Sequence, residues 1–388
     1  MSGPLHLAWR YLAARRGRST LLVLCVAIPL FLPLGLSVAV ERMGRELGTR
    51  ATSVPLVVGA KGSPLDLVLG ALYLDTHPPA ATTMAQVERL RESGLAEAIP
   101  LHLAFRARGF RIVGTTLDYF RFRSLSVSAG RPLGLLGECV VGAEVASSLG
   151  LAPGGRLLSS PGSLFDLAGT YPLRMQVCGV LARSHSADDR AVFVDIRTAW
   201  IIAGLAHGHA ALRPQEILGQ EGQRTVANAS VVQFEEVTPQ NIGSFHFHGE
   251  PGALPVHALI AVPRDAKSAT ILKGRYLDPR DPCQILVPSE VMRDLLDTVA
   301  KVRRLVAAGF ALVGAAALLA VALIFTLGFR LRRREFETLR KLGCARHTIA
   351  AMVAWEIAFV LGAGIAVALL LATGAGALAP ALLRALIL

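Results

Sequence analysis

Twenty-five consecutive residues, Leu305–Phe329, carry no charged side chain. A helix needs about 20 apolar residues to cross the roughly 30 Å hydrocarbon core of a bilayer. Five residues, Arg330–Arg334, follow at once and include four arginines. Because basic residues beside a span favour the cytoplasmic side, the segment predicts both a membrane crossing and its direction. A buried helix of a soluble protein is the alternative, and two further stretches of the same kind argue against it.

The two further uncharged stretches predict two further spans. Ser19–Val40 follows four arginines and contains Pro29 and Pro33. Prolines are tolerated in membrane helices, so we expect a kink rather than a break. A cleaved signal peptide is the alternative here, although its apolar region usually has only about 7–15 residues. The last stretch is Ile357–Leu383, and its glycines predict close packing against another helix.

The basic residues are concentrated beside these stretches. The first 18 residues hold four arginines and no acid, and the loop 330–347 holds seven basic residues against two acids. These two segments supply nine units of the formal net charge of +12, so the high pI indicates membrane topology rather than nucleic-acid binding. We predict a cytoplasmic N-terminus, a large outside domain, a short cytoplasmic loop and an outside C-terminus.

The predicted fold is a membrane protein in which an α-helical transmembrane bundle carries a large α+β extracytoplasmic domain on helical stalks. The expected segments are a cytoplasmic helix at 1–18, spans at 19–40, 305–329 and 351–373, the outside domain with its stalks at 41–304, a cytoplasmic helix at 330–350, and a short hydrophobic segment at 374–388. Flexible linkers are the alternative to the stalks. Within the domain, alternating or β-branched runs predict strands at 139–141, 175–180 and 191–194, and helices are expected at 85–98 and 143–149.

The cytoplasmic loop predicts an amphipathic helix. Phe336, Leu339 and Leu342 share one edge of it, and basic residues occupy most of the rest. Gly343 would end the helix before the chain re-enters the membrane. Such a helix could lie in the headgroup interface, or it could dock into a groove on a cytosolic partner.

The order of these motifs resembles that of the MacB/FtsX-type (mechanotransmission, type VII) ABC transporter permeases. The loop resembles the coupling helix of that family, and residues 7–19 resemble its elbow helix. The matching motifs are Arg334-Glu335, Leu339-Arg340, Leu342-Gly343-Cys344-Ala345-Arg346 and Glu356 in the loop and the next span, and 129–131, 140–142, 149–154 and 177–180 in the outside domain. The family usually has a fourth span, which we expect to be absent here or reduced to a stub at 376–388.

The resemblance implies a permease subunit that couples ATP hydrolysis by a partner to motion of a periplasmic domain, driving export or extraction of a cargo. It implies two copies of an ABC ATPase, a second copy of this permease or a paralogue, a bacterial inner membrane, and room for a periplasmic or lipoprotein partner. The implied coupling residues are Arg334, Glu335, Phe336, Leu339, Arg340, Leu342, Gly343 and Arg346. An FtsX-like regulator of a cell-wall hydrolase is the alternative function.

ATP and magnesium would be used by the partner, because this sequence has no G-x-x-x-x-G-K-[ST] motif; 59–63 has glycine and lysine at the wrong spacing. We also expect no catalysis by this chain. Residues 184–189 include serine, histidine and aspartate, but catalytic triads are assembled by the fold and not by adjacency in sequence, so a polar loop is expected. A membrane-anchored hydrolase using His185 is the alternative. Cys139 and Cys178 lie in strand-like runs and are expected to be buried thiols.

Histidines form the one metal-binding pattern. Alternate residues of a strand face the same side, so His207 with His209 and His246 with His248 could hold zinc or copper, with His257 and Glu250 nearby. Surface histidines without a ligand are the alternative. A zinc site here would connect the transporter with metal handling.

Overall fold

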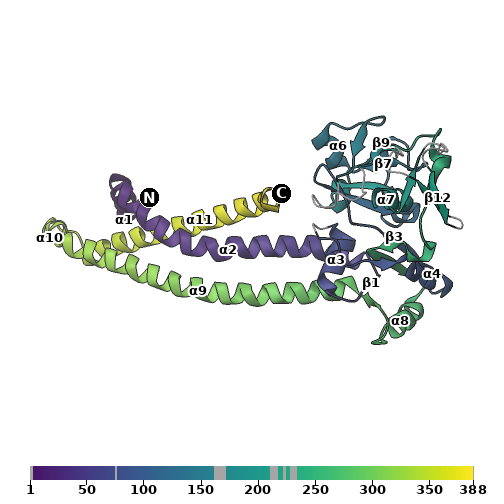
Figure 1. Cartoon of the computed structure of the whole chain (residues 1–388). Coiled ribbons are helices and arrows are strands. Elements are labelled where there is room, and N and C mark those ends of the chain that lie inside the picture. The colour runs from purple at the N-terminus through teal and green to yellow at the C-terminus, as the bar shows by residue number, and fades with distance from the viewer. Residues whose placement is uncertain are drawn as a thin grey trace. The chain divides into compact units, whose positions relative to one another are not determined.

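The computed structural model describes residues 3–74, 77–160, 172–209, 217–221, 224–227 and 234–387 (Figure 1). The chain forms two compact units. The helical unit comprises Met1–Gly48 and Arg293–Leu388, and the α+β unit comprises Thr49–Met292. The chain passes from one unit to the other twice, each time inside a long helix: α2 (Arg16–Thr52) and α9 (Pro288–Leu331).

The helical unit contains α1 (Gly3–Ala14), most of α2 and α9, α10 (Arg333–Lys341) and α11 (Arg346–Ile387). In the described part of the chain, three helical stretches are long and apolar enough to cross a membrane: Arg16–Thr52, Pro288–Leu331 and Arg346–Ala375. Helix α2 continues through Pro29 and Pro33. Helix α11 continues through Pro380 to Ile387, so the residues 374–387 that were expected as a short hydrophobic segment are helical.

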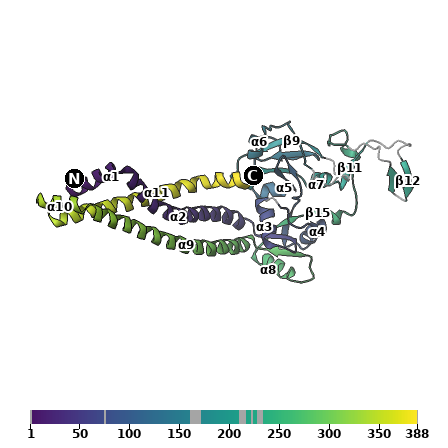
Figure 2. The ribbon, with the colours of Figure 1, turned by 60° about the vertical axis from the view of Figure 1, so that its left-hand side comes forward.

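Helices α2, α9 and α11 lie side by side in both views (Figures 1 and 2). Leu22 and Val26 of α2 pack with Val321 of α9 and Val360 of α11. A Cβ added to Gly364 of α11 would lie 2.7 Å from the Cβ of Val26, which is too close for two carbon atoms. Glycine is therefore needed at this crossing, in agreement with the packing role expected of the small residues in the last stretch.

The expected stalks are helical. Helix α2 runs past residue 40 to Thr52, and α9 begins at Pro288, well before the uncharged stretch. Near their outer ends the two helices approach closely, because a Cβ on Gly44 would lie 3.2 Å from Leu296 Cδ2. Flexible linkers are therefore not what connects the spans with the α+β unit.

The stalks connect to neighbouring strands of one antiparallel sheet. Its order is β17 (Cys283–Leu286), β1 (Leu56–Ala60), β16 (Ala258–Pro263) and β3 (Ala96–Leu101). Strand β1 follows α2 after a short turn, and β17 is followed at once by α9. These two strands pair with each other, with Val57 opposite Leu286 and Ala60 opposite Cys283. Helices α3 (Pro64–Tyr73), α4 (Met84–Glu92) and α8 (Ala266–Arg275) pack on this sheet.

A second, mixed sheet forms the rest of the α+β unit. Its path is β4 (Arg106–Ala107), β5 (Phe110–Thr115), β10 (Ala191–Asp195), β7 (Glu138–Val141), β9 (Arg174–Leu181) and β6 (Val127–Gly130), with β8 (Arg156–Leu158) also paired to β9. Strands β5 and β10 are parallel, as are β7 and β9. Two short helices flank it, α5 (Leu117–Phe122) and α6 (Ala143–Leu149).

Helix α7 (Ile196–Ile202) belongs to both cores of the α+β unit. Its Ala199 packs in the core of the mixed sheet, and its Trp200 packs in the core of the antiparallel sheet. The helix leads into β11 (Ala206–Gly208), which is labelled near it in Figure 2 and pairs with β14 (Phe245–Phe247) in a two-stranded ribbon. Two other ribbons pair β12 (Ile217–Glu221) with β13 (Arg224–Ala227) and β15 (Pro255–Val256) with β2 (Thr82–Thr83).

The three expected strands and the helix at 143–149 are confirmed by β7, β9, β10 and α6. The helix expected at 85–98 is wrong in its second half. Helix α4 ends at Glu92, Gly94 adopts a left-handed φ of 66°, and Ala96–Leu101 forms β3 at the edge of the antiparallel sheet. Pairing with β16 outweighs the helical tendency of the alanines in this segment. The cysteines at 139 and 178 are buried free thiols, as expected.

A buried polar network fixes the end of α2 to the mixed-sheet half of the α+β unit. Arg50, in the last turn of α2, donates two hydrogen bonds of 2.8 Å to the two carboxylate oxygens of Asp188. Tyr119 donates a third, at 2.7 Å, and Ser186 a fourth, at 2.9 Å. Asp188 lies in a short 3-10 helix, Ala187–Arg190, directly before β10. The stalk therefore ends in a charged anchor inside the unit and not only in a peptide connection.

This network predicts an acid-sensitive α+β unit. Burial alone would raise the pKa of Asp188, but the hydrogen bonds and positive charge of Arg50 outweigh it and lower that pKa to about 2. Since the folded-state pKa lies below the ordinary value of 3.8, the ionised carboxylate stabilises the fold above about pH 4, and this contribution is lost as the pH falls towards 2. We expect the difference in urea midpoint between the wild-type chain and Asp188→Asn to shrink from pH 5 to pH 2. A difference that stays constant over this range would contradict the assignment.

Candidate functional site

Helix α10 is the short helix expected in the loop after the second span. It begins at Arg333 and ends at Lys341, and Gly343 follows with φ of 89°, the left-handed conformation that terminates helices. The prediction of a helix that stops at Gly343 is therefore confirmed. The helix is strongly amphipathic, so its two faces have different environments.

The apolar edge of α10 is turned towards the chain itself. Phe336 is only 7% exposed and packs with Ala8 of α1 and with Ile349 and Met352 of α11. Leu339 and Cys344 are partly buried against the same group. This cluster, called here the elbow cluster, joins the consecutive helices α10 and α11 to α1 at the other end of the sequence. Phe336 and Leu339 were expected to contact a partner ATPase, but their apolar surface already has partners within this chain.

The outward face of α10 is basic, with one large apolar side chain at its end. Arg333, Arg334, Arg340 and Lys341 are exposed, as are Glu335 and Glu337. Leu342 is 79% exposed, and Arg346, which starts α11, is exposed as well. Of the apolar residues expected to form one edge, Leu342 alone points away from the elbow cluster. An external partner would therefore meet Leu342 together with exposed basic side chains of the same loop.

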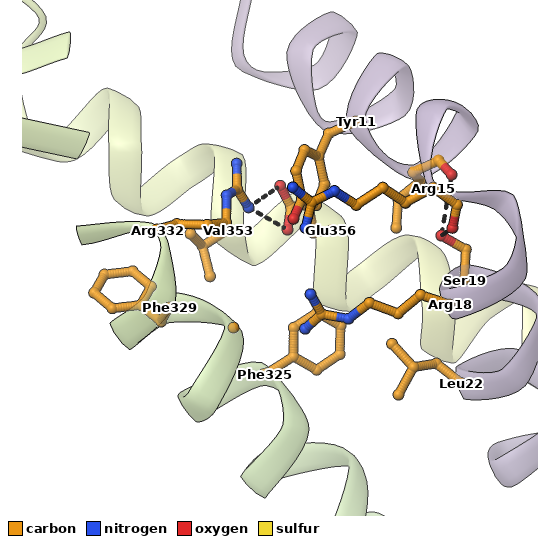
Figure 3. A pocket seen from close by; sticks show the side chains of 12 residues that line it. Tyr11, Arg15, Arg18, Ser19, Leu22, Phe325, Phe329, Arg332, Val353 and Glu356 are labelled. Carbon is orange, nitrogen blue, oxygen red and sulfur yellow. Dashed lines mark hydrogen bonds and ion pairs between the residues drawn. The ribbon is translucent and has the colours of Figure 1, made fainter. Parts of the chain in front are cut away.

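Arg332 forms the polar centre beside the elbow cluster (Figure 3). Its guanidinium donates to both carboxylate oxygens of Glu356, at 3.0 and 3.2 Å, and lies 3.6 Å from the ring centre of Tyr11. It also pairs with Glu335 at 3.2 Å. The side chains of Arg332 and Glu356 are 11% and 5% exposed. One side chain thus connects α1, α10 and α11.

A small cavity adjoins this ion pair and is lined by residues of α1, α2, α9 and α11 (Figure 3). Arg18 of α2 crosses it and donates to the backbone carbonyl of Ile324 in α9 at 3.2 Å. A Cβ on Gly328 would lie 2.3 Å from the Arg18 guanidinium, so glycine makes room for this contact. The basic N-terminal segment is therefore packed into the bundle through Arg18.

Arg332 and Tyr11 were not among the site residues expected from the sequence. Arg332 is one of four arginines in five residues, and nothing in the local pattern distinguishes it from its neighbours. Glu356 gave the usable signal, since it is the only acid between residues 338 and 388 and stands at the edge of an uncharged stretch. A carboxylate in such a place needs a cationic partner.

The two histidine pairs come together on the β11–β14 ribbon. The strands are antiparallel, with His207 opposite His246, and His248 continues the ladder by donating its backbone N–H to Leu205 O at 2.9 Å. His207, His246 and His248 each offer a ring nitrogen within 4.8 Å of the other two. His209 lies at the margin of this group, with its ring centre 5.2 Å from that of His246. Burial, together with the neighbouring histidines, lowers the pKa of His207 to about 4.

His257 does not join this group. It is 7% exposed, its Nδ1 accepts a hydrogen bond from the backbone N–H of Leu103 at 3.2 Å, and its ring centre lies 4.6 Å from that of His102. Burial and the charge of Arg111 lower its pKa to about 4. It is a core histidine whose ring is engaged by the backbone of the segment that follows β3. Glu250 is exposed and precedes the short 3-10 helix Pro251–Ala253.

The serine, histidine and aspartate residues at 184–189 form the expected polar loop. Asp189 accepts hydrogen bonds from the backbone N–H groups of Ser184 and His185, both at 2.8 Å, and from the Ser184 hydroxyl at 2.9 Å. Asp188 is committed to Arg50. The carboxylate of Asp189 therefore stabilises the loop, and that of Asp188 binds the end of α2.

Comparison with known proteins identifies two domains in the chain. Residues 57–226 match the family model of the MacB-like periplasmic core domain, and residues 307–387 match that of the C-terminal domain of FtsX-like permeases. Together these matches cover most of the α+β unit and the last two long helices. No curated protein matches the chain.

Two solved structures resemble parts of the chain. The periplasmic region of MacB from Actinobacillus actinomycetemcomitans is 10% identical, with a TM-score of 0.35, and the match covers 63% of this chain and 94% of that one. The extracellular domain of the noncanonic ABC-type transporter YknZ from Gram-positive bacteria is 12% identical, with a TM-score of 0.32, and the match covers 60% of this chain and 98% of that one.

Proposed function

Because the chain belongs to the MacB/FtsX-type family of ABC transporter permeases, we propose that it couples ATP hydrolysis by a separate cytosolic ATPase to motion of its periplasmic α+β unit. The observation that carries this proposal is the division of α10 into two faces. Its apolar edge is packed in the elbow cluster, and its basic face with Leu342 is open to a partner. Because one face of α10 is packed against α1 and α11 and the other is exposed, a displacement of α10 by the partner would move the bundle.

The partner contact centres on Leu342. Leu342 is a large apolar side chain, 79% exposed beside the basic face of α10, and an apolar groove on a partner would cover it. The surrounding arginines and lysine would attract an acidic rim on the ATPase and orient α10 in its groove. Phe336 and Leu339, expected at first to enter that groove, take a different part in this proposal. They hold α10 to α1 and α11, so that the three helices move together.

The displacement would travel outward along α2 and α9. These helices continue without interruption to Thr52 and from Pro288, and they connect to β1 and β17, which are hydrogen-bonded neighbours. A shift of one stalk along the other would therefore shear that strand pair or turn the whole sheet. Arg50 adds a second attachment, because its bond to Asp188 reaches the mixed sheet. Such motion acts on a periplasmic cargo without a channel through this chain.

The assembly and orientation follow the same proposal. The basic segments at 1–18 and 330–347 lie on the cytoplasmic side of a bacterial inner membrane, and the α+β unit lies in the periplasm. Two copies of this chain, or one copy with a paralogue, would bind two ATPase subunits. The cargo would be exported from, or extracted into, the periplasm.

Leu342→Asp should prevent binding of the ATPase. Placing a carboxylate in an apolar contact at the centre of an interface costs about 2 kcal/mol or more, a roughly 30-fold loss of affinity. The full-length chain would first be affinity-purified from membranes of its host, and the co-purifying protein that carries a G-x-x-x-x-G-K-[ST] motif would be identified by mass spectrometry. Its affinity for the wild-type and variant chains in detergent would then be measured.

Leu277→Asp is the matched control, because Leu277 is 78% exposed but lies in the α+β unit. It should bind the ATPase like the wild-type chain. If no such ATPase co-purifies, or if Leu342→Asp binds as tightly as Leu277→Asp, the proposed contact is wrong.

A further inference from the structure

One face of the β11–β14 ribbon is made of histidines. His207 and His246 are directly opposite in the antiparallel register, and His248 follows two residues after His246 on the same side. The ring centres of these three residues lie 4.7 to 4.9 Å from one another. Three imidazoles therefore converge on one point from two strands that are about forty residues apart in sequence.

The opposite face of the ribbon explains why the ribbon is firmly placed. Phe245 packs against the core of the mixed sheet, and Phe247 meets Trp200 edge to face with ring centres 6.3 Å apart. Gly208 lets Phe245 approach, since a Cβ at that position would lie 2.6 Å from its ring. The phenylalanines and the glycine thus attach the ribbon to the domain. The histidines occupy the outer face, where packing does not require them.

The spacing of the ring nitrogens fits a metal ion. His248 Nε2 and His207 Nδ1 are 3.3 Å apart. Two nitrogens bound to one tetrahedral zinc at about 2.0–2.1 Å lie roughly 3.4 Å from each other, so the pair already has the separation of two ligands. The ligand atoms of the three histidines all lie within 4.8 Å of one another, and small ring rotations would bring the third nitrogen to the same distance.

The backbone also orients His246. Its Nδ1 lies 3.1 Å from the carbonyl oxygen of Ser244. A proton on Nδ1 would be donated to that carbonyl, leaving Nε2 with its lone pair directed outward. Metal-binding histidines characteristically donate their second ring nitrogen to a carbonyl or carboxylate, which fixes both tautomer and orientation. The ribbon therefore supplies a converging ligand set and an outer-shell hydrogen bond for one member.

We propose that His207, His246 and His248 form a periplasmic binding site for one divalent late transition-metal ion, with zinc as the best-fitting ion. Three imidazoles are a ligand set that suits zinc, copper and nickel, and they leave a fourth position for water or for a ligand brought by a cargo. The site goes beyond the proposed ATPase coupling and does not depend on it. In a permease whose α+β unit moves, it would make that unit responsive to the metal or to a metal-bearing cargo.

The test uses the full-length chain in detergent, purified with a tag that contains no histidine and freed of metal with a chelator. Zinc chloride would be titrated by calorimetry at pH 7.5, and cobalt(II) would be added separately to record the visible absorption of its coordination sphere. We expect one zinc per chain with a Kd of about 1 µM or tighter. The cobalt spectrum should indicate nitrogen ligands in four- or five-fold coordination.

Variants assign the ligands. His246→Ala combined with His248→Ala should weaken zinc binding by about 100-fold or more, because loss of outer-shell partners alone costs about 10–100-fold. His209→Ala should retain binding within about threefold, since His209 is placed at the margin. His185→Asn is the control for a single exposed histidine of the same unit, and asparagine accepts the left-handed φ of 55° found there.

The unfolding midpoint of each variant without metal separates a folding defect from a lost ligand, and we expect the double variant to unfold like the wild-type chain. Zinc binding that is absent in the wild-type chain, or unchanged in the double variant, would overturn the proposal. Zinc binding that depends on His209 as strongly as on His246 would overturn the three-ligand assignment.

Discussion

Replacing Asp188 with asparagine should lower the free energy of unfolding of the α+β unit by about 3–5 kcal/mol. Asp188 is 1% exposed and accepts two hydrogen bonds from Arg50, whose side chain is 8% exposed. Asparagine keeps the size of the side chain but removes its charge and one acceptor. The Arg50 guanidinium would then be a buried cation without a counter-ion, which is the costly half of a broken buried pair.

Fluorescence of Trp200 can report this unfolding. Trp200 is 5% exposed in the core of the antiparallel sheet, whereas Trp9 and Trp355 lie in the helical unit. In a Trp9→Phe, Trp355→Phe background, urea unfolding followed at Trp200 therefore reports the α+β unit by itself. The Asp188→Asn chain should show a much lower midpoint with an unchanged slope.

Asp118→Asn provides the comparison, because Asp118 also pairs with an arginine but on the surface. Arg121, its partner, is 79% exposed, and a surface pair of this kind contributes about 0–1 kcal/mol. We expect its midpoint to stay close to that of the parent chain. If Asp188→Asn and Asp118→Asn lower the urea midpoint equally, the Arg50–Asp188 pair does not anchor the stalk.

The gross architecture could be predicted from the sequence because it depends on long uncharged stretches and on alternating apolar and polar residues. The uncharged stretch Leu305–Phe329 needs no tertiary information to be recognised as a span, and the alternating runs at 175–180 and 191–194 sufficed for β9 and β10. Residues 96–101 show where such reasoning fails. Alanines favour a helix locally, but the segment forms six residue pairs with β16, a partner more than 150 residues away.

The orientation of α10 could not be derived from its pattern. An apolar edge at Phe336 and Leu339 predicts that something covers it, but not whether the cover is another protein or this chain. The structure supplies Ala8, Ile349 and Met352, from segments about 340 residues apart. In the same way, a run of arginines does not reveal that Arg332 turns inward to Glu356 while Arg333 remains 83% exposed.

For the histidine cluster, the sequence predicted the pairs within each strand but not that the two pairs meet. Spacing alone places His207 with His209 and His246 with His248 on common strand faces. That the two pairs meet depends on the pairing of β11 with β14, and that His257 stays apart depends on its hydrogen bond to Leu103 in the interior. Sequence spacing gives the members of a pair, whereas long-range pairing decides which pairs become one site.

Replacing Arg332 with methionine should detach α10 from the bundle. The change leaves Glu356, whose side chain is 5% exposed, as a buried carboxylate without its cation, and it removes the contact with the Tyr11 ring. Breaking a buried pair by removing one partner costs about 3 kcal/mol or more, which would shift a local opening equilibrium by roughly 100-fold. The outward face of α10 would keep its residues, so under the proposed coupling the ATPase should still bind while its motion is no longer passed to α1 and α11.

Cys344 is a native probe for this opening, because it is partly buried against the elbow cluster. Its rate of maleimide labelling in membranes, read by mass spectrometry of the 344-containing peptide, should rise at least tenfold in Arg332→Met. Arg333→Met is the matched control, since Arg333 is 83% exposed and pairs along the helix surface with Glu337. It should label like the wild-type chain.

The double variant Arg332→Met with Glu356→Met separates the charge effect from loss of packing. It leaves no unpaired buried charge, and replacing a whole buried pair with apolar side chains of similar volume is often neutral. Its Cys344 should therefore label more slowly than that of Arg332→Met. If the double variant labels as fast as the single one, the elbow cluster is held by packing around Arg332 and the ion pair contributes little. If neither variant differs from Arg333→Met, α10 is not held by Arg332, and the proposed transmission of motion from α10 to α1 and α11 is wrong.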